Sequence, residues 1–546
     1  MCGISGAWKK NANQSYLEKN IQSMIASLQH RGPDASGVWI ESNHGLAFGH
    51  NRLAIQDLSS NGNQPMVSSN HRYIIVFNGE IFNFLDLKKD HKDLSNISFN
   101  SNSDTEVLLE LISLVGLKQT LHLIRGQFAF ALWDKKNNEL SMCRDRFGEK
   151  PLYIYQDHEA IFFASELIAL RKIPNLNLEI CSDSVKEFLS YGYINHPRSI
   201  YKNVIKLSPG SVHVYKNFKL IDQYKFFSLE KDVLFHKRSH KPSIMDIENR
   251  LTTSIEKMLI SDAPIGAFLS GGIDSSLVCA IASKKLNASI DTFSIGFDDS
   301  NHDESSHAET VAKLLNTKHH SFHVTDHDAI NYIPKVGQIF SEPFADSSQI
   351  PTLLLSELTK QHVTVALSGD GGDELFSGYN RYRFALMLDA FKIKGLNNSA
   401  LLKNVMRSIE PLFRTVNFFS RARIPLLDNK LEKIRRVLDS DSIHESYNQI
   451  TKNDKNFFDP KSGYHPPRLD FLHKDISALD YFFFNDLHSY LSEDILTKVD
   501  RSSMSHSLEV RSPFLDLELL QMSFLMDRKD KINFFSGKRV LKKNSV

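Results

Sequence analysis

Two kinds of hydrophobic pattern divide the chain. Over roughly the first 170 residues, short runs of β-branched and aromatic residues bounded by turn residues predict strands. The clearest runs are CGISGAW at the start, RYIIVF at 72–77, QFAFALWD at 127–134 and IFFAS at 161–165. Apolar residues at helical spacing predict two helices in the same region, at 17–28 and, after a capping box SDTE at 103–106, at 107–114. Strands interrupted by helices predict an α+β layered domain.

Later in the chain, strand-like and helix-like patterns alternate. The apolar strand-like runs lie at 265–270, 290–297, 318–324 and 362–367. Alternation of this kind predicts a doubly wound parallel α/β sheet with right-handed crossovers, whose ligands bind beyond the carboxyl ends of the strands. The predicted division is a first domain at 1–200, a connecting region and polar linker at 201–243, and a second domain at 244–546 with a helical insert at about 380–480.

Composition narrows the class of protein. The chain has 546 residues, of which 41% are hydrophobic and 24% charged, typical of a soluble globular protein. Lys and Arg number 65 against 64 Asp and Glu, which gives no electrostatic reason to expect nucleic acid or a membrane as partner. Neither an apolar run of membrane-spanning length nor a signal peptide is visible. The four cysteines lack metal-ligand spacing, so we expect a cytoplasmic protein with reduced thiols.

Cys2 directly follows Met1 and has two interpretations. A small cysteine commonly fills a buried strand. Removal of Met1 would instead place a thiol and an α-amine on one residue. Such an amine has an ordinary pKa of about 7.7–8.0 and could act as the general base for the thiol. The second interpretation requires that Met1 be absent from the active protein.

Other polar residues of the first region fit a site around Cys2. Asn78 and Gly79 form a hairpin-turn dipeptide, but they could also donate hydrogen bonds to an oxyanion. Glu80 could face a cationic group of a substrate, and Arg52 could pair with a substrate carboxylate. By itself, Arg52 is more typical of a surface ion-pair partner, and Asp104 is by default an ordinary residue of a helix N-terminus.

A glycine-rich loop, LSGGIDSS at 269–276, follows one predicted strand of the second region. Gly271 and Gly272 would let the backbone approach an anion, while Ser275 and Ser276 add hydroxyl donors at the start of a helix. The loop lacks the GxxxxGK[ST] pattern of a Walker A motif. A plain helix-entry turn is the alternative.

A second glycine-rich loop, LSGDGGDELFSGY at 367–379, carries Asp370, Asp373 and Glu374. An acidic loop of this kind can simply be a solvated turn. However, Asp274 and Asp373 are expected on adjacent strand ends, where they could hold Mg²⁺, which needs only one or two carboxylates beside phosphate.

The motifs MCGISG, HRGPD, RLAIQD, FNGEIFN, SDTE and RDRFGEKPLY, in this order, resemble the class II glutamine amidotransferase domain. The resemblance implies an N-terminal-nucleophile fold, an α-β-β-α sandwich in which Cys2 attacks the side-chain amide of glutamine. It further implies that Asn78 and the Gly79 N–H form an oxyanion hole and that Arg52 holds the glutamine carboxylate. Glu80 and Asp104 would hold the glutamine ammonium group, and the backbone of the pocket would be that of Leu53, Ala54, Ile55 and Gln56.

The second region resembles the synthetase domain of glutamine-hydrolysing asparagine synthetases. The SGG-x-DS loop is similar to that of ATP pyrophosphatases, and SEPFADSSQIPT at 341–352 and the segment at 490–516 follow in the family's order. The resemblance implies adenylation of aspartate and then displacement of AMP by ammonia that passes along an enclosed path. It assigns Asp370 to the acyl-adenylate step and Lys538 to transition-state charge, and places ATP against Leu269, Ser270, Ile295, Ser368 and Gly369.

The chain departs from the family at the insert near 380–480 and at its end, where Lys538 lies eight residues from Val546. These departures leave alternatives open. One is a related enzyme that amidates a sugar carboxylate, another is a shortened member with glutaminase activity alone, and a third is a non-catalytic relative. The expected small molecules are glutamine, ATP with Mg²⁺, and aspartate or another carboxylate, and a homodimer is a possible assembly.

Overall fold

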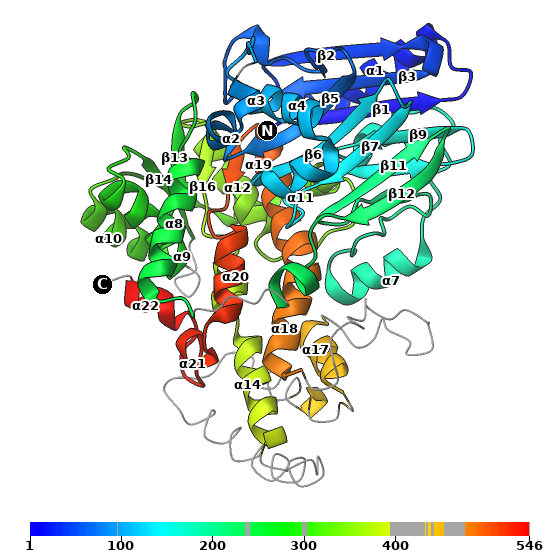
Figure 1. The fold of residues 1–546 in the computed structure, drawn as a ribbon. Helices are drawn as coiled ribbons and strands as arrows, with labels where there is room; N and C mark the ends of the chain where they lie inside the picture. The colour runs from blue at the N-terminus through cyan, green and yellow to red at the C-terminus, as the bar shows by residue number, and fades with distance from the viewer. Residues whose placement is uncertain are drawn as a thin grey trace.

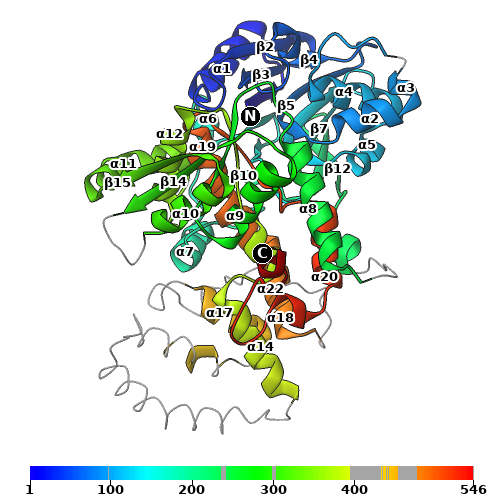
Figure 2. The same ribbon diagram turned by 90° about the vertical axis from the view of Figure 1, so that its left-hand side faces the viewer.

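The fold was analysed in a computed structural model (Figures 1 and 2). The structure describes residues 1–95, 97–234, 241–297, 303–393, 442–452 and 476–544, together with 432, 435–437 and 440. Most of the predicted insert and residues 235–240 of the predicted linker lie outside the described residues.

Two antiparallel sheets of six described strands each form the first part of the molecule. The first sheet has the order β10 (Val204–Lys206), β8 (Tyr153–Gln156), β9 (Ala160–Ala164), β1 (Gly3–Lys9), β3 (Leu46–Arg52) and β2 (Ala35–Glu41). The second has the order β12 (Lys219–Lys225), β11 (Ser211–Lys216), β7 (Glu139–Arg144), β6 (Gly126–Asp134), β5 (Tyr73–Ile81) and β4 (Met66–Val67). The segment expected to connect the domains therefore supplies strands to both sheets.

Helices cover the outer faces of these sheets. A cluster that includes Trp8, Phe48, Ile74 and Trp133 packs between the sheets. Outside them lie α1 (Gln14–Ser27), α2 (Phe84–Asp90), α3 (Lys92–Ser95), α4 (Asp104–Val115), α5 (Leu117–Leu123), α6 (Leu167–Leu170) and α7 (Ser182–Tyr191), with short 3₁₀ turns at Ser42–His44 and Ser60–Gly62. The predicted α-β-β-α sandwich is confirmed.

A five-stranded parallel sheet organises the rest of the described chain. Its order is β15 (Lys318–Val324), β14 (Asp291–Phe297), β13 (Ile265–Phe268), β16 (Val365–Leu367) and β17 (Glu509–Arg511). All four pairings between these strands are parallel, and helices connect the strands, so the predicted doubly wound α/β sheet is confirmed. β17 was not predicted as a strand. Its three residues are too few to show the alternation that identifies strands in a sequence.

The helices of this second part begin with α8 (Ile244–Met258), α9 (Ile273–Ala280), α10 (Ser305–Leu315), α11 (Asp326–Phe340), α12 (Gln349–Lys360) and α13 (Gly372–Phe376). They continue with α14 (Asn380–Ile393), α17 (Ile443–Thr451), α18 (Ala478–Asn485), α19 (Leu496–Met504), α20 (Leu517–Leu525), α21 (Arg528–Lys531) and α22 (Arg539–Asn544). The described residues also include π-helical stretches at η3 (Glu230–Leu234), η4 (Ile281–Lys285) and η6 (Asp486–Ile495). In both views α14, α17 and α18 project away from the two antiparallel sheets (Figures 1 and 2).

The structure excludes the hairpin-turn alternative for Asn78–Gly79 and corrects the capping box predicted at 103–106. Asn78 and Gly79 do not form a hairpin turn, because both lie inside β5, paired with Ala129 and Phe128 of β6. The SDTE segment does begin a helix with Ser103 as its N-cap, but Glu106 does not close a capping box. Its carboxylate instead accepts the N–H groups of Asn100 and Ser101, at 2.9 and 2.7 Å, and so fixes the loop before the helix.

Candidate active sites

Cys2 is buried at the start of β1, opposite the middle of β5. Its backbone nitrogen donates to Asn78 Oδ1 at 2.9 Å. Burial raises the pKa of the Cys2 thiol, and the Met1 ammonium, an N–H of Leu53 and the Arg52 guanidinium oppose that rise. With its oxygen engaged, the Asn78 amide has a buried Nδ2 that lacks a hydrogen-bond partner in the described part of the chain. This arrangement leaves one buried amide donor on the side chain that contacts the Cys2 backbone.

Met1 extends from the Cys2 site into the contact between the two domains. Its α-ammonium group lies 3.0 Å from Glu509 Oε2, and both groups are fully buried. Its side chain packs with Leu53 and Ile55 of the first domain and with apolar side chains of the second. In this chain the nitrogen of Cys2 is therefore a peptide nitrogen, and the adjoining ammonium belongs to Met1.

Two buried carboxyl groups, Glu80 and Asp104, lie on the other side of this region. Asp104 accepts the Ile81 N–H at 2.7 Å, and burial raises its pKa to about 6. Burial, Asp104 and Glu509 raise the pKa of Glu80 well above its usual range. The Arg511 guanidinium, 3.7 Å away, lowers this pKa but compensates only in part. Two carboxyl groups that are costly to ionise would gain from a neighbouring cation such as a substrate ammonium group.

Arg52 ends β3, and its guanidinium is already engaged by the loop that follows. It donates to Ser59 O at 2.6 Å and to Asn63 Oδ1 at 2.9 Å, and it also bonds the carbonyls of Gln56 and Asp57. Arg52 therefore holds the loop that contains Leu53, Ala54, Ile55 and Gln56. Its assignment to a substrate carboxylate stays a prediction.

Arg31 joins the Cys2 site to the second domain, a role that the sequence did not suggest. Its Nε donates to the Cys2 carbonyl at 3.1 Å, and its two terminal nitrogens each lie 2.9 Å from an Asp500 oxygen on α19. Glu166 accepts a further bond at 2.7 Å and also pairs with Arg501. All four side chains are buried, so the backbone of Cys2 is held partly by residues of the second domain.

A second candidate site is a cavity of about 390 Å³ at the carboxyl ends of β13 and β16. Of the residues predicted to bind ATP, it is lined by Ser270, Gly272, Asp274, Ser275, Ser368 and Gly369. Asp370, Asp373 and Lys538 line it as well. Four other predicted residues, Leu269, Gly271, Ser276 and Ile295, are not among those that line it. Leu269 is buried, and Ile295 packs against a cluster that includes Tyr191 and Phe340.

The two predicted metal ligands converge on a lysine. Lys538 Nζ lies 2.5 Å from Asp274 Oδ2 and 2.7 Å from Asp373 Oδ1. Asp274 Oδ1 is buried without a hydrogen-bond partner in the described residues, and burial together with Asp373 raises the Asp274 pKa to about 6 despite Lys538. Two converging carboxylates with a spare oxygen fit a hard cation such as Mg²⁺. In the part of the chain described, no group of three or more His, Cys, Asp or Glu could hold a metal alone, so phosphate oxygens would have to complete such a site.

Lys498 adds a second cation to this cavity and was also missed by the sequence analysis. Its Nζ donates to Ser348 Oγ at 2.7 Å and lies 3.2 Å from Asp346 Oδ1. Burial raises the pKa of Asp370, and Lys498 moderates that rise. Asp346, Ser348 and Lys498 belong to segments quoted for the resemblance, which was the only signal that could have identified them.

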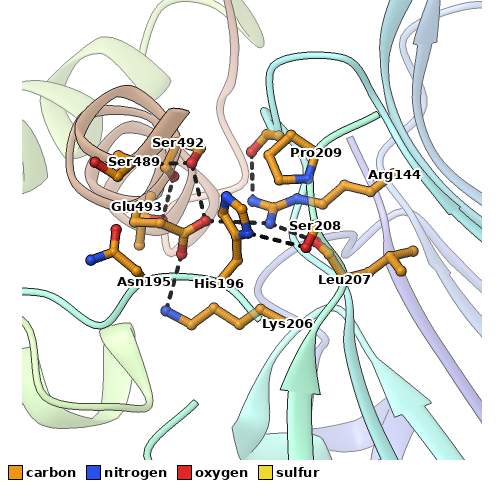
Figure 3. Close-up of polar contacts among 12 residues, drawn as sticks. Arg144, Asn195, His196, Lys206, Leu207, Ser208, Pro209, Ser489, Ser492 and Glu493 are labelled. Carbon is orange, nitrogen blue, oxygen red and sulfur yellow. Dashed lines mark hydrogen bonds and ion pairs between the residues drawn. The ribbon is translucent and has the colours of Figure 1, made fainter. Parts of the chain in front are cut away.

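A buried ionic cluster lies between the domains (Figure 3). Glu493 on η6 is 3.2 Å from Lys206 Nζ and 3.6 Å from Arg144, and Lys206 also pairs with Glu342 at 2.7 Å. His196 bridges Ser208 Oγ and the His488 carbonyl, each at 3.0 Å. These groups join β7 and β10 of the first domain to η6 of the second.

Comparisons with known proteins match two families, one over each part of the chain. Residues 1–227 match the glutamine amidotransferase domain family, and residues 246–544 match the asparagine synthase family. Glutamine-hydrolyzing asparagine synthetase 1 of Bacillus subtilis is 33% identical over 533 residues, which covers 94% of this chain and 79% of that protein. A putative asparagine synthetase of Methanocaldococcus jannaschii is 34% identical over 74% of this chain and 84% of its own length. Asparagine synthetase B of Escherichia coli K12 is 29% identical over 79% and 74%, respectively. No helix among the described residues is long and apolar enough to cross a membrane.

Proposed function

The chain belongs to the asparagine synthase family, and on that premise we propose that it is a glutamine-hydrolysing asparagine synthetase. It converts ATP, aspartate and glutamine to asparagine, glutamate, AMP and pyrophosphate. The observation that carries this proposal is the match of one chain to both an amidotransferase domain and an asparagine synthase domain. Each domain also contains a buried or concave polar site suited to its half of the reaction.

In the first domain, the proposed nucleophile is the Cys2 thiol, acting after removal of Met1. Its α-amine takes the thiol proton, and the sulfur attacks the side-chain amide carbon of glutamine. Asn78 Nδ2 and the Gly79 N–H stabilise the oxyanion, which fits the unpartnered Asn78 donor. Ammonia leaves, and water hydrolyses the thioester to glutamate. Glu80 and Asp104 hold the glutamine ammonium group. Arg52 orders the loop that follows β3 and through that loop holds the glutamine carboxylate.

In the second domain, the side-chain carboxylate of aspartate attacks the α-phosphorus of ATP and releases pyrophosphate. Ammonia then displaces AMP from β-aspartyl-AMP. Ser270, Gly272 and Ser275 offer donors to the phosphates, Lys538 neutralises developing negative charge, and Asp370 assists the acyl-adenylate step. Asp274 and Asp373 would hold Mg²⁺, which would neutralise phosphate charge when bound.

Ammonia must pass between the sites in its neutral form, because its protonated form is not a nucleophile. An enclosed path through the domain contact would serve this need, and the apolar surroundings of Met1 lie in that contact. The cytoplasmic location and the homodimer considered from the sequence stay predictions.

Pyrophosphate release tests the proposal. The purified chain is given ATP and glutamine, and aspartate or a uronic acid is added in turn. We expect release that depends on aspartate and forms asparagine in equal amount. Release that depends on the uronic acid alone would replace the acceptor with a sugar carboxylate. Glutamine hydrolysis without pyrophosphate release under any condition would contradict a synthetase function.

A further inference from the structure

Lys538 occupies the position between Asp274 and Asp373 that a divalent cation would need. The same two carboxylates that would hold a divalent cation are bridged by the ammonium group of Lys538, at 2.5 and 2.7 Å. A lysine ammonium and a hydrated Mg²⁺ cannot occupy one position between two carboxylates. The Lys538–Asp274 half of the contact is well shielded, because the two side chains are 16% and 10% exposed, whereas the Asp373 side chain is 34% exposed.

The surrounding backbone is shaped around this contact. A Cβ on Gly378 would lie 1.5 Å from Asp373 Oδ1 and 2.3 Å from Lys538 Cε, and a Cβ on Gly372 would lie 2.5 Å from Asp274 Cγ. Both positions therefore need glycine for the two carboxylates and the ammonium group to meet. The spare, buried Oδ1 of Asp274 shows that this carboxylate has coordinating capacity that Lys538 does not use.

The backbone of Lys538 is fixed while its side chain projects into the cavity. Its φ is +51°, a conformation unusual for a lysine, and its N–H donates to Phe376 O at 3.1 Å. The Lys542 N–H donates to the Lys538 carbonyl at 3.0 Å, which begins α22. A change of side-chain rotamer alone could thus turn the ammonium group from the carboxylates toward a phosphate in the same 390 Å³ cavity.

We propose that Lys538 and Mg²⁺ are alternative occupants of one cation position between Asp274 and Asp373. Before nucleotide binds, Lys538 fills this position and keeps free divalent cations out. When nucleotide arrives with its metal, the metal takes the carboxylates and the released ammonium group pairs with the phosphates. This deepens the proposed function, on which it rests, because it gives Lys538 a role in admitting the metal as well as in neutralising phosphate.

Metal binding without nucleotide tests the idea directly. Mn²⁺ is titrated into the full chain, and the free ion is followed by electron paramagnetic resonance. We expect Lys538→Met and Lys538→Gln to bind one Mn²⁺ at least tenfold more tightly than the wild type, about 1.4 kcal/mol. Lys538→Arg keeps the positive charge and should bind as weakly as the wild type. Lys542→Met, a lysine of α22 whose Nζ contacts Ser536, is the matched control and should also behave as the wild type.

The new metal must be located at the proposed position. Adding Asp373→Asn to Lys538→Met should abolish the gained affinity, and metal that persisted in the double variant would overturn the proposal. Unchanged or weaker Mn²⁺ binding in both Lys538→Met and Lys538→Gln, with circular dichroism showing folded protein, would overturn it as well.

Affinity for nucleotide should change in the opposite direction from affinity for Mn²⁺ alone. A non-hydrolysable ATP analogue with Mn²⁺ should bind Lys538→Met more weakly than the wild type, because the ammonium group is missing from the phosphates. Loss of a lysine with only a structural role would not raise the affinity for Mn²⁺ while lowering the affinity for the analogue, so equal affinity for the analogue would count against the exchange. These titrations contain no acceptor or glutamine, so a failure of the proposed asparagine synthesis would leave them interpretable.

Discussion

Replacing Glu493 by glutamine removes one negative charge from the buried contact between the domains while keeping the side-chain shape. Glu493 is 1% exposed and pairs with Lys206 and Arg144. Burial by itself would raise its pKa, but Lys206, Arg144 and His196 outweigh burial and lower the pKa from 4.5 to about 2. The folded state therefore favours the ionised carboxylate.

The size of the effect follows from this pKa. At about 1.4 kcal/mol per pH unit, a pKa lowered from 4.5 to about 2 corresponds to about 3 kcal/mol of stability. A lowered pKa means that this contribution is complete above about pH 5 and is lost as the pH falls through about 2. By about pH 3, less than half of it should remain. Glu493→Gln should thus cost about 3 kcal/mol near neutral pH and much less in acid.

Urea unfolding followed by tryptophan fluorescence measures the difference. The three tryptophans, Trp8, Trp39 and Trp133, all lie in the domain that carries Arg144 and Lys206. Glu139→Gln is the matched control, since Glu139 pairs with Lys216 on a more exposed surface and should contribute at most about 1 kcal/mol. The reasoning fails if Glu493→Gln is no less stable than this control near neutral pH. It also fails if the loss is equally large at about pH 3.

Three further predictions concern the two sites. Cys2→Ala should abolish glutamine-dependent asparagine formation and spare formation from added ammonium, and surviving glutamine use would exclude Cys2 as the nucleophile. Asp500→Asn should lower kcat for glutamine hydrolysis by about tenfold or more, since it loosens the Arg31 bond to the Cys2 carbonyl at 3.1 Å, and an unchanged rate would show that the contact across the domains is not needed. Gly378→Ala should abolish pyrophosphate release and leave glutamine hydrolysis intact, because the added Cβ would lie 1.5 Å from Asp373 Oδ1, so normal release would contradict the geometry.

Local sequence determined the elements of this protein and the types of residue at its sites. Strand and helix periods predicted both layered folds, because burial on one face imposes a period of two or 3.6 on the apolar residues. β13, β14 and β15 lie within about a residue or two of the predicted runs. The ordered motifs predicted the asparagine synthetase family, and most of the predicted ATP-loop residues line the cavity at the ends of β13 and β16.

Only the tertiary structure decided which residues meet across long separations. The dipeptide Asn78–Gly79 is typical of a turn, yet pairing with β6 holds it inside a strand, where the Asn78 amide lies beside Cys2. Arg31 and Asp500 are 469 residues apart, and no local pattern connects them. Likewise, the sequence predicted Asp274 and Asp373 as a pair, but their contact with Lys538 depends on packing between α9, α13 and the start of α22. Periodicity records which face of an element is buried, whereas the partner buried against it is set by the fold as a whole.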